Sequence, residues 1–229
     1  MRQKLIYALA IAGGLFVLRN LYVILLVLPN EARQGIFYRI IFFHVPCWFI
    51  CFSAFFAAGV SSALYLAKRK TVFDDVAVSA VEVGLVFTGA GLATGSIWGR
   101  IAWGIWWTWD PRLTWAFITF LVYLGYLMLR RAIDDPSERA KNSAVLCIFA
   151  FASVVITYKA IDWWSQMQHP GAVLSFRTGG GNIDPGMEIM LLWNFLAVGM
   201  IAAAVLLLRI RQEQVKRELE SLRRQAHAL

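Results

Sequence analysis

The chain has 229 residues, of which 59% are hydrophobic, against roughly 45–50% in an average soluble domain. The apolar residues form long blocks, which favours a membrane protein with one helical bundle over a water-soluble domain. The net charge of +8 does not indicate nucleic-acid binding, because most basic residues lie in short segments between the apolar blocks.

Six apolar segments are long enough to cross the hydrocarbon core of a bilayer, which takes about 20 helical residues. They are roughly 5–28, 40–66, 76–97, 113–130, 142–160 and 187–208. The first is too long for the apolar region of a signal peptide, so we interpret it as an anchor. The sequence therefore predicts an all-α integral membrane protein, with a six-helix membrane domain over 1–208 and a charged helical tail over 209–229.

The distribution of Lys and Arg predicts the orientation of the bundle. The amino terminus, 67–75, 130–141 and the tail together hold 15 basic residues, whereas 29–39, 98–112 and 159–186 hold six. The side that is richer in basic residues faces the cytoplasm. We therefore expect both termini to be cytoplasmic and the other three segments to face outward.

The second outward segment, 98–114, is unusually rich in tryptophan, with six of the ten tryptophans of the chain lying within 98–115. Tryptophans scattered at helix ends are membrane-interface anchors, but this density favours a platform for a large flat aromatic ligand. Arg100 and Arg112 could pair with carboxylates on such a ligand. Asp110 is interpreted as a cap of the following helix or as a partner that orients Arg112. The platform candidates are Trp98, Trp103, Trp106, Trp107 and Trp109.

Two histidines lie on the predicted outward face, His44 near the end of the second span and His169 in the third outward segment. Imidazole is the commonest metal ligand, and haem iron takes ligands on both sides of its plane. Neither histidine belongs to a zinc motif, and no Cys-x-x-Cys-His motif predicts covalent haem attachment. The spacing leaves two readings open, ligation by both histidines and ordinary hydrogen-bonded histidines. Arg177 is a further candidate partner for a carboxylate.

The segment Trp103-Gly-Ile-Trp-Trp-Thr-Trp-Asp-Pro-Arg-Leu-Thr114 resembles the tryptophan-rich signature of the haem-handling proteins of cytochrome c biogenesis. With six spans, the chain is most similar to the cytochrome c maturation protein C, or haem exporter protein C, family. The resemblance extends from about residue 5 to 208. His44 in a His-Val-Pro sequence and His169 after a Trp-Trp pair match the two outward histidines of that family.

The resemblance implies that the chain handles haem b, bound without a covalent bond at the outer face of a bacterial inner membrane. It implies His44 and His169 as axial ligands, with Trp103, Trp106, Trp107, Trp109 and Asp110 as the platform. The implied partners are the ATPase and membrane subunits of an ATP-binding-cassette transporter, a small single-span companion subunit and a membrane-anchored haem chaperone. The implied role is haem export or delivery and not catalysis.

Three alternatives remain. A haem lyase subunit would carry the same signature, but the larger relatives of that kind have more spans and more outward histidines. An electron-transfer protein with haem b would place its histidines on facing helices across the membrane, whereas both lie near one face here. In the third alternative, the tryptophans only anchor a protein that binds no haem.

The charged tail carries a thin apolar stripe, because Val215, Leu219 and Leu222 are spaced at i, i+4 and i+7. Such a stripe is typical either of a short solvated helix or of a docking surface for a cytoplasmic partner. The sequence does not separate these two readings.

Overall fold

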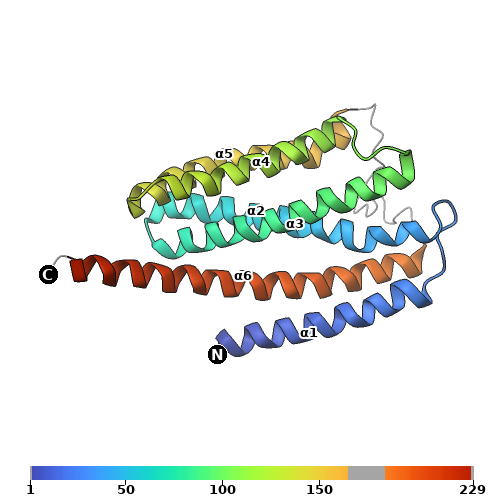
Figure 1. The fold of residues 1–229 in the computed structure, drawn as a ribbon, viewed down its shortest axis with the longest axis horizontal. Coiled ribbons are helices and arrows are strands. Elements are labelled where there is room, and N and C mark those ends of the chain that lie inside the picture. The colour runs from blue at the N-terminus through green and yellow to red at the C-terminus, as the bar shows by residue number, and fades with distance from the viewer. Residues whose placement is uncertain (1, 165–183, 228–229) are drawn as a thin grey trace.

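The computed structural model describes residues 2–164 and 184–227, and these residues form six long helices (Figure 1). Each of the six is long and apolar enough to cross a membrane, and the described residues contain no β-strand. The predicted all-α, six-helix membrane fold is therefore confirmed. The helices are α1 Arg2–Tyr22, α2 Ile41–Lys68, α3 Thr71–Trp103, α4 Pro111–Ala132, α5 Pro136–Trp163 and α6 Pro185–His227.

The helices pack as pairs, α1 with α6, α2 with α3 and α4 with α5, and α5 also packs on α2 (Figure 1). Both termini lie at one end of the bundle, beside the α2–α3 and α4–α5 turns. We call this the terminal end. The opposite end, which carries residues 28–40 and 104–110, is called the loop end. Termini at a common end are what an even number of spans requires, while the side that faces the cytoplasm stays a prediction.

Local sequence signals set the helix boundaries. Asp110 and Asp135 cap α4 and α5, and the proline that follows each of them occupies the first helical position, where a missing N–H costs nothing. Asp135 Oδ1 accepts from the backbone nitrogens of Ser137 at 2.9 Å and Glu138 at 2.8 Å. Helix α3 ends where Gly104 adopts a φ of +77°, a left-handed conformation that favours glycine.

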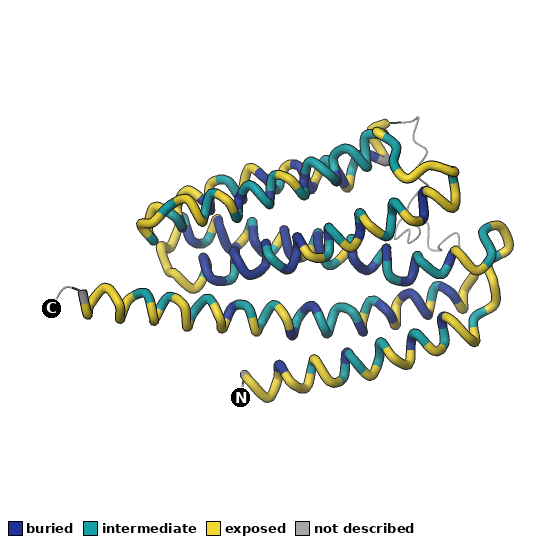
Figure 2. Tube along the Cα trace, in the orientation of Figure 1, coloured by how far each residue is buried: buried dark blue, intermediate teal, exposed yellow. Residues whose placement is uncertain are grey.

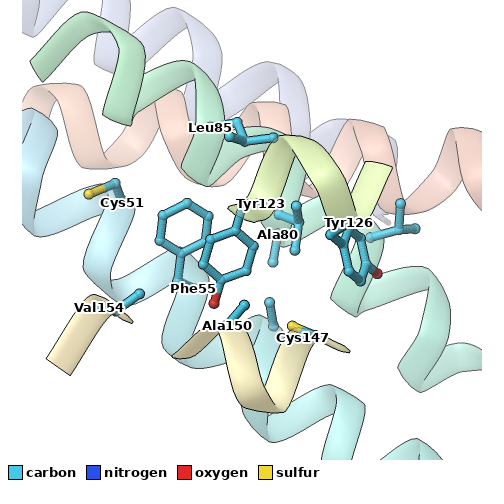
Figure 3. Packing of buried hydrophobic residues seen from close by; sticks show 12 residues of the cluster. Cys51, Phe55, Ala80, Leu85, Tyr123, Tyr126, Cys147, Ala150 and Val154 are labelled. Atoms are coloured by element: carbon cyan, nitrogen blue, oxygen red, sulfur yellow. The ribbon is translucent and has the colours of Figure 1, made fainter. Parts of the chain in front are cut away.

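The largest buried cluster lies between α2, α3, α4 and α5 (Figure 3). Phe55 of α2 stacks on Tyr123 of α4, with ring centroids 3.8 Å apart and an angle of 5° between the planes. Cys51 and Cys147 are free and fully buried in this cluster, where they act as small packing residues. Burial is concentrated on α2 and α3, whereas α1 and α6 have long exposed stretches (Figure 2), as expected for lipid-facing helices.

A proline inside α2 creates a buried polar link between three helices. Pro46 has no N–H, so the carbonyl of Phe42, four residues earlier, lacks its usual helical donor. Asn194 of α6 donates its side-chain amide to that carbonyl, and Asn20 of α1 donates to Asn194 Oδ1 at 3.2 Å. Both asparagines are fully buried. The link fixes the first turns of α2 against α1 and α6, and His44 lies in those turns.

Ion pairs fasten the charged tail to the terminal end, because α6 continues as a single helix to His227. Arg209 donates through Nε to Glu82 Oε2 of α3 at 2.7 Å. Arg217 contacts Asp75, and Arg139 of α5 contacts Glu220 at 3.1 Å. The segment from Arg209 onward is therefore neither a separate short helix nor fully solvated.

Candidate functional site

His44 lies in the second turn of α2 at the loop end and is 5% exposed. Its Nδ1 is 2.9 Å from the hydroxyl oxygen of Thr94 on α3. That hydroxyl donates its only hydrogen to the carbonyl of Ala90, at 2.7 Å, so towards the imidazole it acts as an acceptor. This network assigns the imidazole proton to Nδ1 and leaves the lone pair on Nε2, the nitrogen that can bind a metal.

The Nε2 lone pair of His44 is engaged by a tryptophan one helical turn away. Trp48 donates from its indole Nε1 to His44 Nε2 across 3.1 Å. Trp98 of α3 packs edge-on against the same imidazole, with ring centroids 5.8 Å apart and an angle of 71°. A metal ion bound at Nε2 would need the lone pair that already accepts the hydrogen bond from the indole N–H. Ligation by His44 therefore requires Trp48 to give up its hydrogen bond.

Glycines of α3 let the His44–Trp48 pair lie directly on the backbone of that helix. A Cβ atom at Gly91 would lie 2.9 Å from Trp48 Cε2, and one at Gly95 would lie 3.0 Å from His44 Cε1. Both distances are shorter than ordinary van der Waals contact, so a larger residue at either position would displace the pair. The two glycines thus form the floor of the site.

A small cavity adjoins this pair, and Trp103 and Arg112 contribute to its lining. Its volume of about 20 Å³ is close to the space that one water molecule needs. A porphyrin does not fit into this cavity as it stands. Haem binding at His44 therefore requires that Trp48, Trp103 or neighbouring side chains move outward, or that the macrocycle lies over the exposed outer surface.

The tryptophan-rich segment differs from the expected continuous loop. Helix α3 extends to Trp103, so Trp98, Arg100 and Trp103 are helical, and only residues 104–110 form the loop before α4. No proline occurs between the expected end of the span at residue 97 and Gly104, and the isolated Gly99 is tolerated inside a helix. Arg100 donates to the carbonyl of Gly104 and so helps to close this end of α3.

The tryptophans of the segment divide into an inner and an outer group. Trp98 is 7% exposed and donates to Gln34 Oε1 at 2.7 Å, so it offers no open face. Trp106 and Trp109 are 60% and 74% exposed. Trp107 packs edge-on against Trp109, with centroids 5.8 Å apart, and its indole nitrogen is buried without a partner among the described residues. The outer group presents the aromatic surface on which a flat ligand could rest.

Asp110 and Arg112 have separate roles in the structure. Asp110 Oδ1 accepts from the backbone nitrogen of Leu113 at 3.0 Å and its Oδ2 accepts from Thr108 at 2.8 Å. The interpretation of Asp110 as a helix cap is thereby confirmed. Arg112 is partly buried and lines the cavity beside His44. Its guanidinium can approach a carboxylate that enters the site from outside.

His169 and Arg177 lie outside the described residues, so their positions relative to His44 stay predictions. The described chain stops at Trp164, directly after α5, and resumes at Asp184, and both points lie at the loop end (Figure 1). Thr157 of α5 lines the cavity beside His44, so α5 approaches the site. Among the described residues, no three His, Cys, Asp or Glu side chains could together hold a metal ion.

Sequence reasoning missed the residues that hold His44 in place. Trp48 lies four positions after His44, which places the two side chains on one helix face, so this spacing was a usable signal. Thr94 and the floor glycines had no comparable signal, because they reach His44 only through the packing of α3 on α2.

Comparison with known proteins places the chain among haem-handling proteins. The family model described as "Heme exporter protein C" matches residues 1–225. Proteins named "Heme exporter protein C" from Bradyrhizobium diazoefficiens and Paracoccus denitrificans are each 36% identical over 194 residues, which is 85% of this chain and 73% and 80% of theirs. The protein of that name from Escherichia coli K12 is 29% identical over 183 residues, covering 80% of this chain and 73% of its own.

Proposed function

This chain belongs to the haem exporter protein C family, and from that premise we propose that it binds haem b without a covalent bond at the loop end and passes it on during cytochrome c maturation. The observation that carries the proposal is the state of His44, a buried imidazole whose Nε2 accepts a hydrogen bond from the indole N–H of Trp48. A neutral imidazole in an aromatic setting suits an iron ligand that must also be released.

We propose His44 and His169 as the two axial ligands. Thr94 supports this role for His44, because a hydrogen bond at Nδ1 orients the ring and raises the basicity of Nε2. The exposed faces of Trp106 and Trp109, with Trp107 behind them, provide the platform. Trp103 and Asp110 border it, and Trp98 supports the imidazole from the side. Arg112, with Arg100 and Arg177, supplies cations for the propionates.

The geometry suggests an order of events for binding. The outer tryptophans can receive the apolar surface of the macrocycle without rearrangement, because they are already exposed. His44 can reach the iron only after Trp48 releases Nε2 and the small cavity widens. On release, the same indole N–H competes for the lone pair. This competition keeps the affinity moderate, as a carrier that passes on its cargo requires.

The proposed partners follow from the family. They are the ATPase and membrane subunits of an ATP-binding-cassette transporter, a small single-span companion and a membrane-anchored haem chaperone that receives the haem. The basic-rich terminal end supports a cytoplasmic position for both termini, which puts the haem site at the periplasmic face of a bacterial inner membrane. The role is transport and delivery.

The absorption spectrum of the purified protein tests this proposal. The chain is expressed with ample haem, and His44→Ala and His169→Ala are compared with the parent for haem content and Soret position. We expect both variants to lose haem or to shift the Soret band. Unchanged content and unchanged band position in both would refute axial ligation by these residues.

A further inference from the structure

A second and larger cavity lies at the terminal end, opposite the haem site. It is bounded by the last turns of α4, the first turn of α5 and the part of α6 beyond Arg209, and it reaches Glu82 on α3. Its volume is about 590 Å³. Nothing in the proposed haem chemistry uses this cavity, so its lining calls for a separate explanation.

The lining carries an excess of positive charge, with seven basic and four acidic side chains. Most of the acids are already neutralised from within the bundle. Glu82 and Glu213 both contact Arg209, and Glu220 contacts Arg139. Asp134, on the rim, is the exposed exception among the four. The internal pairs therefore leave a surplus of cations facing the cavity.

Three arginines of the lining have no carboxylate partner among the described residues. Arg131 is on the last turn of α4, and Arg223 and Arg224 are on the distal part of α6. Within the part of the chain that the structure describes, Arg224 donates to the backbone carbonyl of Glu220, at 3.3 Å, and to no carboxylate. All three are exposed, so their guanidinium groups can turn towards a shared anion. Without one, like charges from α4 and α6 face each other across the cavity and repel.

The lining of the same cavity also includes apolar side chains. Val78, Leu127 and Ile133 contribute to its lining, and Val78 is almost fully buried in the bundle. The cavity thus combines an apolar wall with cationic side chains at the terminal end of the bundle. Basic pockets of this kind between membrane helices bind the head groups of anionic lipids.

We propose that this cavity binds a phosphate-bearing anion, supplied by the head group of an anionic phospholipid, with Arg131, Arg223 and Arg224 as its ligands. The phosphate bridges α4 and the distal part of α6, and the glycerol and upper acyl carbons lie against the apolar wall. Bound lipid therefore adds a link between the tail and the bundle, beside the internal ion pairs. This inference does not depend on haem binding.

Native mass spectrometry of the purified full chain tests the proposal, with phosphatidylglycerol and phosphatidylcholine as the probes. The test variant is R131Q/R223Q/R224Q, which breaks no ion pair between the described residues. We expect phosphatidylglycerol to be retained in preference to phosphatidylcholine by the parent, and to bind roughly tenfold or more weakly to the variant. Retained helical circular dichroism shows that the variant folds, and Arg131→Gln alone provides a milder second test.

The matched control is K4Q/K70Q/R211Q, which removes the same charge from exposed positions outside the cavity. We expect it to bind phosphatidylglycerol as the parent does. Equal binding of both lipids to the parent, or equal losses in the two triple variants, would overturn the proposal. Inorganic phosphate serves as a separate arm in lipid-free detergent. If added phosphate raised the unfolding temperature of the parent but not that of R131Q/R223Q/R224Q, this would support the phosphate site and identify free phosphate as a second source.

Discussion

Replacing Trp48 with phenylalanine removes the indole N–H that His44 Nε2 accepts and keeps an aromatic ring on the glycine floor. The lost hydrogen bond joins two neutral groups, and such a bond makes a net contribution to stability of about 0.5–1.5 kcal/mol. In the proposed binding mode, haem must displace this bond before His44 can bind the iron. Because the variant no longer has it to break, we expect Trp48→Phe to bind haem roughly two- to tenfold more tightly and to release it more slowly.

The assay is haem titration of the purified protein followed at the Soret band, with release measured by transfer to excess apomyoglobin. Trp193→Phe is the matched control, since this tryptophan lies on α6 and stacks on Phe16 of α1, with ring centroids 5.8 Å apart. We expect the control to behave as the parent. If Trp48→Phe weakened haem binding, Trp48 would be a supporting residue and the competition for Nε2 would be wrong.

Three further substitutions test the supports of the site. Asn194→Leu should lower the free energy of unfolding by about 1–3 kcal/mol, because it leaves two buried polar partners unpaired; an unchanged denaturation midpoint in detergent would contradict the link around α2. Gly95→Ala should weaken haem binding in the same titration, since the added methyl would lie 3.0 Å from the imidazole of His44. Gly89→Ala is its control and should have little effect, because the added methyl there would lie 3.7 Å from its nearest neighbour. Asp110→Ala should cost about 1 kcal/mol of stability through the lost cap and Asp110→Asn much less, and equal thermal shifts for the two would argue for a role other than capping.

The sequence was sufficient for the membrane architecture, because long apolar segments have few alternatives in a bilayer. All six expected spans coincide with described helices. The capping role of Asp110 was also predictable, since an acid followed by proline is a local signal.

The arrangement around His44 was not predictable, because it depends on contacts between helices. The Nδ1 partner Thr94 is 50 residues away in sequence, and nothing local indicates that α3 presents its glycines to α2. The separation of the tryptophans into buried and exposed groups has the same origin. Trp98 faces inward because α3 continues through it as a helix, which places Trp98 against Gln34 in the segment before α2.

The tail shows a further limit of sequence reasoning. Its apolar stripe is indeed exposed, as Val215, Leu219 and Leu222 all face outward. The ion pairs on its other side join residues that lie far apart in sequence, such as Arg217 and Asp75. The number of charges in the tail predicts that its basic residues pair with acidic ones, but it does not predict which acidic residues these are. The attachment of the tail to α3, and the cavity beside it, could therefore be found only from the packing of the helices.

Chemical rescue tests most directly whether the imidazole of His44 binds the iron of haem. In His44→Gly, we expect the spectrum of the six-coordinate ferric complex to be lost and added imidazole to restore it. A spectrum equal to that of the parent without added imidazole would contradict the claim.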